Sequence, residues 1–248
     1  KLPQNHMGHY AAGLATKIFR QICSAKTLKD GSPVPFAAKT GVNWDFASID
    51  DIARSAMEAY LIFHYIFIAS DSEEEREYKY FAWIMDSLLK RRKIYPMHIY
   101  ERLRKIEEIQ DELPNIEKIL ETDDRETKVI RESLKDNKFF QELMQSTDIK
   151  RKKQFEEMQK KGWFPSLWND LQKNVPEFDN INAHQVLSQV VHSNYWHIRQ
   201  IIMAKTAQEQ IDLCGFGMSI FLIIMARMIF EYPTLFPGGK NALKKHPE

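Results

Sequence analysis

The chain has 248 residues and a mass of 29.3 kDa, so it is long enough to bury a sizeable core. Its apolar fraction of 44% excludes a disordered protein, and its net charge of +1 gives no bulk electrostatic case for a nucleic-acid or membrane-surface partner. The two cysteines, Cys23 and Cys214, exclude a disulfide framework, and the first ten residues lack the apolar core of a signal peptide, so we expect a cytoplasmic protein.

Apolar residues at helical spacing predict helices over residues 10–25 and 78–92, on either side of a central stretch at 52–70. This central stretch, IARSAMEAYLIFHYIFIAS, is apolar almost all round from Ala59 onward, as expected of a helix in the core. Ser48, three residues before Asp51, is the expected N-cap of this helix. Arg54 and Glu58 lie four residues apart in its first turns and therefore on one face.

The middle of the chain, residues 100–161, is rich in both charge signs and contains no glycine. Its apolar residues form narrow stripes, which predict exposed helices. We therefore expect a single helical domain over 8–248, with 97–161 as a protruding charged helical insertion that could bind a protein partner through residues 100–161. The basic run 150–153 could hold a phosphate backbone, although the acidic residues around it favour a solvated helix face.

The last third of the chain returns to core character. Residues 182–205 predict a helix on which His184, Ser188 and His192 fall at successive four-residue steps. The run 213–230, LCGFGMSIFLIIMARMIF, is near the lower limit for a membrane span, but Arg227 and two glycines favour a buried helix of a soluble protein, with no membrane partner. Since no segment alternates with the period of a strand, the predicted class is all-α, a multi-helix bundle.

The sequence contains no helical metal-ligand spacing, no phosphate-binding glycine loop and no nucleophile elbow, so we expect no metal and no cofactor. Two polar pairs remain, Arg54 with Glu58 and Ser188 with His192, on two helices that we expect to pack together. An Arg for a phosphate, a His for proton transfer and a Glu to orient it suit metal-free phosphodiester cleavage or nucleotide binding. We expect Glu58 to lie beside His192 and to raise the pKa of this imidazole.

The motifs ARSAMEAY and VLSQVVHSN resemble an uncharacterised family of bacterial all-helical proteins, with an Arg-x-x-x-Glu helix early and a Ser-x-x-x-His helix late. This family is loosely associated with the HEPN (higher eukaryotes and prokaryotes nucleotide-binding) superfamily, which includes many RNases of toxin–antitoxin and anti-phage systems. The resemblance covers roughly residues 10–68 and 182–230. It implies Arg54, Glu58, Ser188 and His192 as site residues, and RNA or a nucleotide as ligand.

The pattern typical of HEPN nucleases, an Arg followed a few residues later by a His on one helix, is met at Arg92 and His98, where Pro96 interrupts the helix. Two functions from different classes therefore stay open. One is a HEPN-like, metal-independent RNase or nucleotide-binding effector of a toxin or defence system. The alternative is a non-enzymatic helical interaction module that binds a protein partner through its charged middle.

Overall fold

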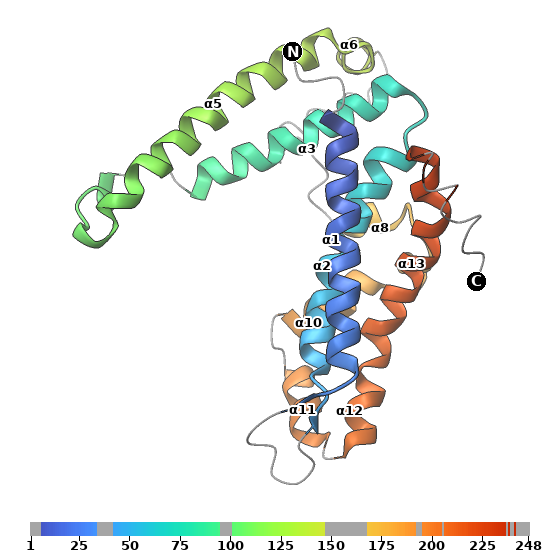
Figure 1. Cartoon of the computed structure of the whole chain (residues 1–248). Helices are drawn as coiled ribbons and strands as arrows, with labels where there is room; N and C mark the ends of the chain where they lie inside the picture. Colours follow the sequence, from blue (N-terminus) through green and yellow to red (C-terminus); the bar gives the residue numbers. More distant parts are fainter. Residues whose placement is uncertain are drawn as a thin grey trace. The chain divides into compact units, whose positions relative to one another are not determined.

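The protein is all-α, as the sequence predicts. The computed structural model describes residues 6–33, 42–94, 101–146, 168–191, 195–204, 206–236, 238 and 241 (Figure 1). Contacts divide the chain into two compact units, one made of residues 8–69 and 167–248 and the other of residues 1–7 and 70–166. The sequence places the start of the charged insertion at residue 97, whereas the longer segment of the second unit begins at Ser70 and includes the helix before the insertion.

The first unit is built around one helix and the helices packed on it. Its elements are α1 (His6–Lys29), β1 (Ser32–Pro33), β2 (Val42–Asn43), α2 (Phe46–Phe63), the π-helical turn η1 (His64–Ile68), α8 (Trp168–Gln172), α9 (Pro176–Asn180), α10 (Ala183–Val191), α11 (Tyr195–Met203), α12 (Ala207–Leu213) and α13 (Gly215–Leu235). The two short strands form one antiparallel pair.

The central apolar stretch forms the core of the first unit, as predicted. Figure 1 shows α2 and α13 running alongside one another, and α10 and α8 also pack on α2. Side chains all around α2 are buried because neighbouring helices cover several of its faces: Ala53, Ala56, Met57, Ala59, Tyr60, Leu61 and Phe63. This arrangement puts Arg54 and Glu58 of α2 between helices rather than in open solvent.

The N-cap of α2 is Asp45, so the prediction of Ser48 is wrong. The Asp45 carboxylate accepts hydrogen bonds from the backbone N–H of Ser48 at 3.1 Å and from the Ser48 hydroxyl at 2.6 Å. A carboxylate at this position also interacts favourably with the positive end of the helix dipole. Ser48 therefore belongs to the capping arrangement as a donor.

The expectation that the C-terminal apolar run is buried is correct for one face of α13 only. Gly217, Ile220, Phe221 and Ile224 are buried, whereas Leu222, Ile229 and Phe230 are 60%, 50% and 78% exposed. In the described part of the chain, one helical stretch, Ala207–Leu235, has the length and hydropathy of a membrane span, with a mean hydropathy of 2.1 and 28% of its most apolar window buried. A core helix and a membrane span both satisfy that criterion.

The second unit contains α3 (Glu73–Ile94), the 3₁₀ turn η2 (Glu107–Glu112), α5 (Leu113–Asp136) and α6 (Lys138–Gln145). The predicted helices of the charged middle are thus present, and α5 and α6 pack on α3. Asn137 caps α6 through Phe140 N–H at 2.9 Å and donates to the carbonyl of Glu74 at 3.0 Å. The basic run 150–153 lies outside the described residues, as does His192.

Candidate functional site

The packing of α10 on α2 brings the predicted pair Arg54 and Glu58 together with His184. Arg54 Nε donates to Glu58 Oε1 at 3.0 Å, and His184 Nε2 lies 3.8 Å from the same oxygen. A guanidinium and an imidazole from two helices therefore converge on one carboxylate oxygen. We call these three residues the Arg54 cluster.

The Arg54 cluster is half-buried and holds two polar atoms without hydrogen-bond partners. The side chains of Arg54, Glu58 and His184 are 18%, 25% and 16% exposed, so solvent reaches the cluster chiefly beside Glu58. Within the described residues, Arg54 Nη1 and His184 Nε2 are covered and have no hydrogen-bond partner. An unpaired buried polar atom costs free energy, and an anionic oxygen that entered beside Glu58 could pair with the guanidinium.

Burial lowers the pKa of His184 below its ordinary value, and the Arg54 cation lowers it further. The Glu58 carboxylate raises the pKa, but its effect is the smaller one. At neutral pH the imidazole is therefore held neutral, which is the state required of a proton acceptor. The sequence predicts a raised pKa for His192 beside Glu58. For His184, the histidine that the structure places near Glu58, the net change is a lowered pKa.

Neighbouring residues hold His184 in place. The Gln172 side chain of α8 accepts a hydrogen bond from the His184 backbone N–H at 3.1 Å. The rings of Trp168 and His184 lie 6.2 Å apart between centroids, at an angle of 30°. The imidazole is thus positioned by α8 as well as by its own helix.

Ser188 lies one turn beyond His184 on α10 and is partly buried. In the part of the chain that the structure describes, it forms no hydrogen bond with Arg54 or Glu58. Because His192 is outside the described residues, the Glu58–His192 contact stays a prediction. His184 belongs to the same four-residue series as Ser188 and His192, so the sequence pattern already contained it.

A second polar cluster, which sequence reasoning missed, joins α2, η1, α9 and α13. Tyr60 donates to Glu231 at 2.8 Å, and Arg227 Nε donates to the Tyr60 oxygen at 2.7 Å. Arg227 Nη1 forms two hydrogen bonds with Glu177, at 2.9 and 2.8 Å, and His64 Nδ1 lies 3.1 Å from Glu231. We call these five residues the Tyr60 network.

The Tyr60 network satisfies its charges internally. Burial raises the pKa of Glu231, but hydrogen bonds from His64 and Tyr60 and the charge of Arg227 lower it more, so the net pKa is below the ordinary value. Burial and the neighbouring Glu231 carboxylate raise the pKa of Tyr60. Since its donors and acceptors are matched, we interpret the network as a structural connection between α2 and α13 rather than as a site.

Among the described residues, no group of three or more His, Cys, Asp or Glu side chains is close enough to hold a metal ion. In comparisons with known proteins, the sequence matches no family model and no characterised protein, and the fold matches no solved structure. The HEPN resemblance thus rests on the sequence motifs around Arg54 and Ser188.

Proposed function

We propose that the protein is a HEPN-like effector of a toxin or anti-phage system that binds RNA at the Arg54 cluster and cleaves it without a metal ion. The observation that carries this proposal is the pair of unpartnered nitrogens, Arg54 Nη1 and His184 Nε2, beside one carboxylate. Arginine recognises phosphate oxygens with a fixed fork of donors, and a neutral imidazole accepts protons.

In the proposed reaction, the ribose 2′-hydroxyl attacks the adjacent phosphorus and loses its proton to His184. The new bond joins the 2′-oxygen to phosphorus, the bond to the 5′-oxygen breaks, and the products carry a 2′,3′-cyclic phosphate and a 5′-hydroxyl. Arg54 stabilises the charge that develops on the phosphoryl oxygens, and Glu58 orients both groups. His192 stays the sequence-based candidate for returning a proton to the leaving oxygen, and Ser188 for a ligand contact.

The test is incubation of the protein with labelled RNA in EDTA. His184→Ala should lower the cleavage rate by about 10²–10⁴-fold, and Arg54→Gln by about 10²–10³-fold. His9→Ala and Arg20→Gln are matched controls on the exposed surface of α1 and should retain the parental rate. Cleavage that disappears in EDTA, or that persists in His184→Ala, would rule out the proposal.

The alternative, a non-enzymatic interaction module, has its own support in the second unit. Ile119 on α5 and Met144 on α6 are apolar and 45% and 52% exposed, so both side chains are accessible to a protein partner. If no cleavage is detected and a purified partner protein loses affinity for Ile119→Glu, the interaction module is the better description.

A further inference from the structure

A groove of about 550 Å³ lies between α3 and α5 in the second unit. The two helices are antiparallel, because Arg91 near the end of α3 binds Asp123 in the middle of α5, while Asn137 after α5 binds Glu74 at the start of α3. The volume is in the range of ligand sites in proteins. The groove lies entirely within this unit and contains no residue of the Arg54 cluster.

Cations outnumber free carboxylates in this groove. Arg91 binds Asp123, and Arg92 binds Asp124, so these two acids are already neutralised. Lys128, Arg131 and Lys135 also line the groove, and none of them forms an ion pair within the described part of the chain. Glu132 is the one remaining carboxylate of the lining, which leaves three cations against one anion.

The spacing of the three cations suits an extended polyanion. Lys128, Arg131 and Lys135 lie at positions i, i+3 and i+7 of α5 and so form one stripe along the helix. At the rise of an α-helix the stripe is about 10 Å long. A chain with regularly repeated negative charges could therefore contact all three residues at once.

The lining favours a phosphate backbone over an acidic protein helix. A docked helix needs apolar area to bury, but of the two leucines in the lining Leu88 is only 4% exposed and Leu89 only partly exposed. The described lining contains no aromatic side chain on which a base could stack, so any binding would depend on charge and not on sequence. The protein's net charge of +1 gave no sign of this groove, because the positive charge is local.

We propose that the α3–α5 groove binds the sugar–phosphate backbone of single-stranded RNA, without sequence preference, through Lys128, Arg131 and Lys135. The choice of RNA among polyanions rests on the proposed function. The inference deepens that function by adding a contact site for the substrate that is separate from the residues proposed to cleave it.

The experiment measures binding of a fluorescent 2′-O-methyl oligouridine of about 15 nucleotides by anisotropy. This probe lacks the free 2′-hydroxyl and is not cleaved by the proposed reaction. Three phosphate contacts predict that affinity falls about twentyfold between 50 and 200 mM salt. The triple variant Lys128→Gln, Arg131→Gln, Lys135→Gln should bind about tenfold or more weakly at low salt and lower the slope of log K against log salt by about two.

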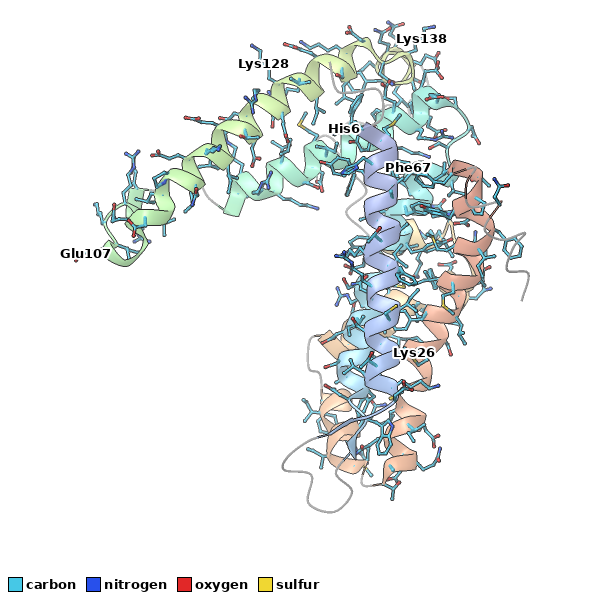
Figure 2. All side chains as sticks on the ribbon, in the orientation of Figure 1. His6, Lys26, Phe67, Glu107, Lys128 and Lys138 are labelled. Atoms are coloured by element: carbon cyan, nitrogen blue, oxygen red, sulfur yellow. The ribbon has the colours of Figure 1, made fainter. Side chains whose placement is uncertain are left out.

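A second triple variant provides the matched control for charge. Lys118→Gln, Arg125→Gln, Lys138→Gln removes the same charge from exposed positions outside the groove, and it should bind as the parent does. Figure 2 shows Lys128 along α5 and Lys138 at the start of α6. Equal losses in both triple variants, or no binding by the parent, would overturn the proposal, as would polyglutamate displacing the probe at equal charge concentration.

The two proposals fail separately. Binding that depends on the groove, together with no cleavage of ordinary RNA, would support the groove and reject the RNase. Cleavage that depends on His184, together with unchanged probe binding in the groove variant, would reject the groove and retain the RNase.

Discussion

At the scale of single residues, Asp50 is a buried carboxyl whose pKa lies well above its ordinary value. Burial raises its pKa to about 7, the backbone N–H of Gly217 lowers it, and Asp51 raises it. Among the described residues, Asp50 Oδ1 has no hydrogen-bond partner. The backbone N–H of Gly217 therefore offsets only part of the free-energy cost of burying this carboxylate. In the folded protein this carboxyl is therefore mainly protonated below about pH 7.

Asp50 should therefore make the stability of the protein depend on pH. Because the folded pKa lies above the unfolded one, its contribution is complete below about pH 4 and is lost as the pH rises through 7, by about 4 kcal/mol. Asp50→Asn should flatten the decrease in unfolding free energy between pH 4 and pH 8, measured with urea. Asp51→Asn changes the same charge at an exposed position and should leave most of the decrease in place. The same pH dependence in parent and Asp50→Asn would contradict the prediction.

The sequence predicted the contact between Arg54 and Glu58, but it did not predict the contact of Tyr60 with Arg227, because the latter joins distant parts of the chain. The Arg54–Glu58 pair follows from four-residue spacing on one helix. In contrast, Tyr60 meets Arg227 and Glu231 across more than 160 residues of chain. The i,i+4 spacing of Arg227 and Glu231 was a signal, but only tertiary packing shows which residue of α2 they contact.

At the scale of elements, α2 and α13 approach closely where α13 begins. A Cβ on Gly217 would lie 2.5 Å from Asp50 Oδ1 and 3.0 Å from Ile49 Cγ2. These distances are shorter than normal contacts, so a glycine is required for the two helices to keep this separation. The sequence showed this glycine as an interruption of an apolar run, not as the point of contact.

Gly217→Ala should accordingly destabilise the protein by about 1–3 kcal/mol, because the methyl group forces α2 and α13 apart. Gly215→Ala is the control, since no atom lies within 4 Å of the Cβ position at residue 215. It should be neutral or stabilising by up to about 1 kcal/mol, because alanine has less freedom to lose on folding. Urea unfolding of both variants measures the difference. Equal stabilities for the two would show that α13 is not packed on α2 as described.

Arg227 should contribute to the connection between α2 and α13 mainly through its buried partner. Arg227→Met leaves Glu231, whose side chain is 12% exposed, without its guanidinium, at a cost of about 3–5 kcal/mol. Glu177→Gln removes the partner that is 47% exposed and should cost about 1 kcal/mol or less. Chemical denaturation separates the two cases. Similar costs for both variants would contradict the interpretation of the Tyr60 network as a buried connection.

The one-sided exposure of α13 was not predictable from its sequence. A helix that is apolar all round gives no indication of which face contacts the core, and α13 has Leu222 and Phe230 on its exposed surface. The pattern of α5 is amphipathic, and its narrow apolar stripe predicted an exposed helix. In the structure Ile119 of this stripe is 45% exposed, whereas Ile130 and Leu134, further along the helix, are buried.

At the scale of the whole molecule, the division into two units follows long-range contacts that composition does not reveal. The sequence changes character near residue 97, where charge density rises, but α3 belongs with the charged helices. Tyr78 of α3 lies against Phe139 and Phe140 of α6, with ring centroids 5.4 and 6.1 Å apart. The aromatic side chains before the compositional change therefore pack with those after it, so the contact-based division at Ser70 precedes the change in composition.

Residues 70–166 should for that reason fold on their own. Their core joins α3, α5 and α6, and Arg91 holds the buried Asp123 inside the same segment. We expect the isolated segment to be helical by far-ultraviolet circular dichroism and to unfold in one cooperative transition. Arg91→Ala should lower its midpoint by about 4–8 °C for each kcal/mol lost, because Asp123 is then buried without its partner. Arg102→Ala, at an exposed position, should leave the midpoint unchanged. A gradual loss of helicity, with no effect of Arg91→Ala, would show that the segment needs the remainder of the chain to fold.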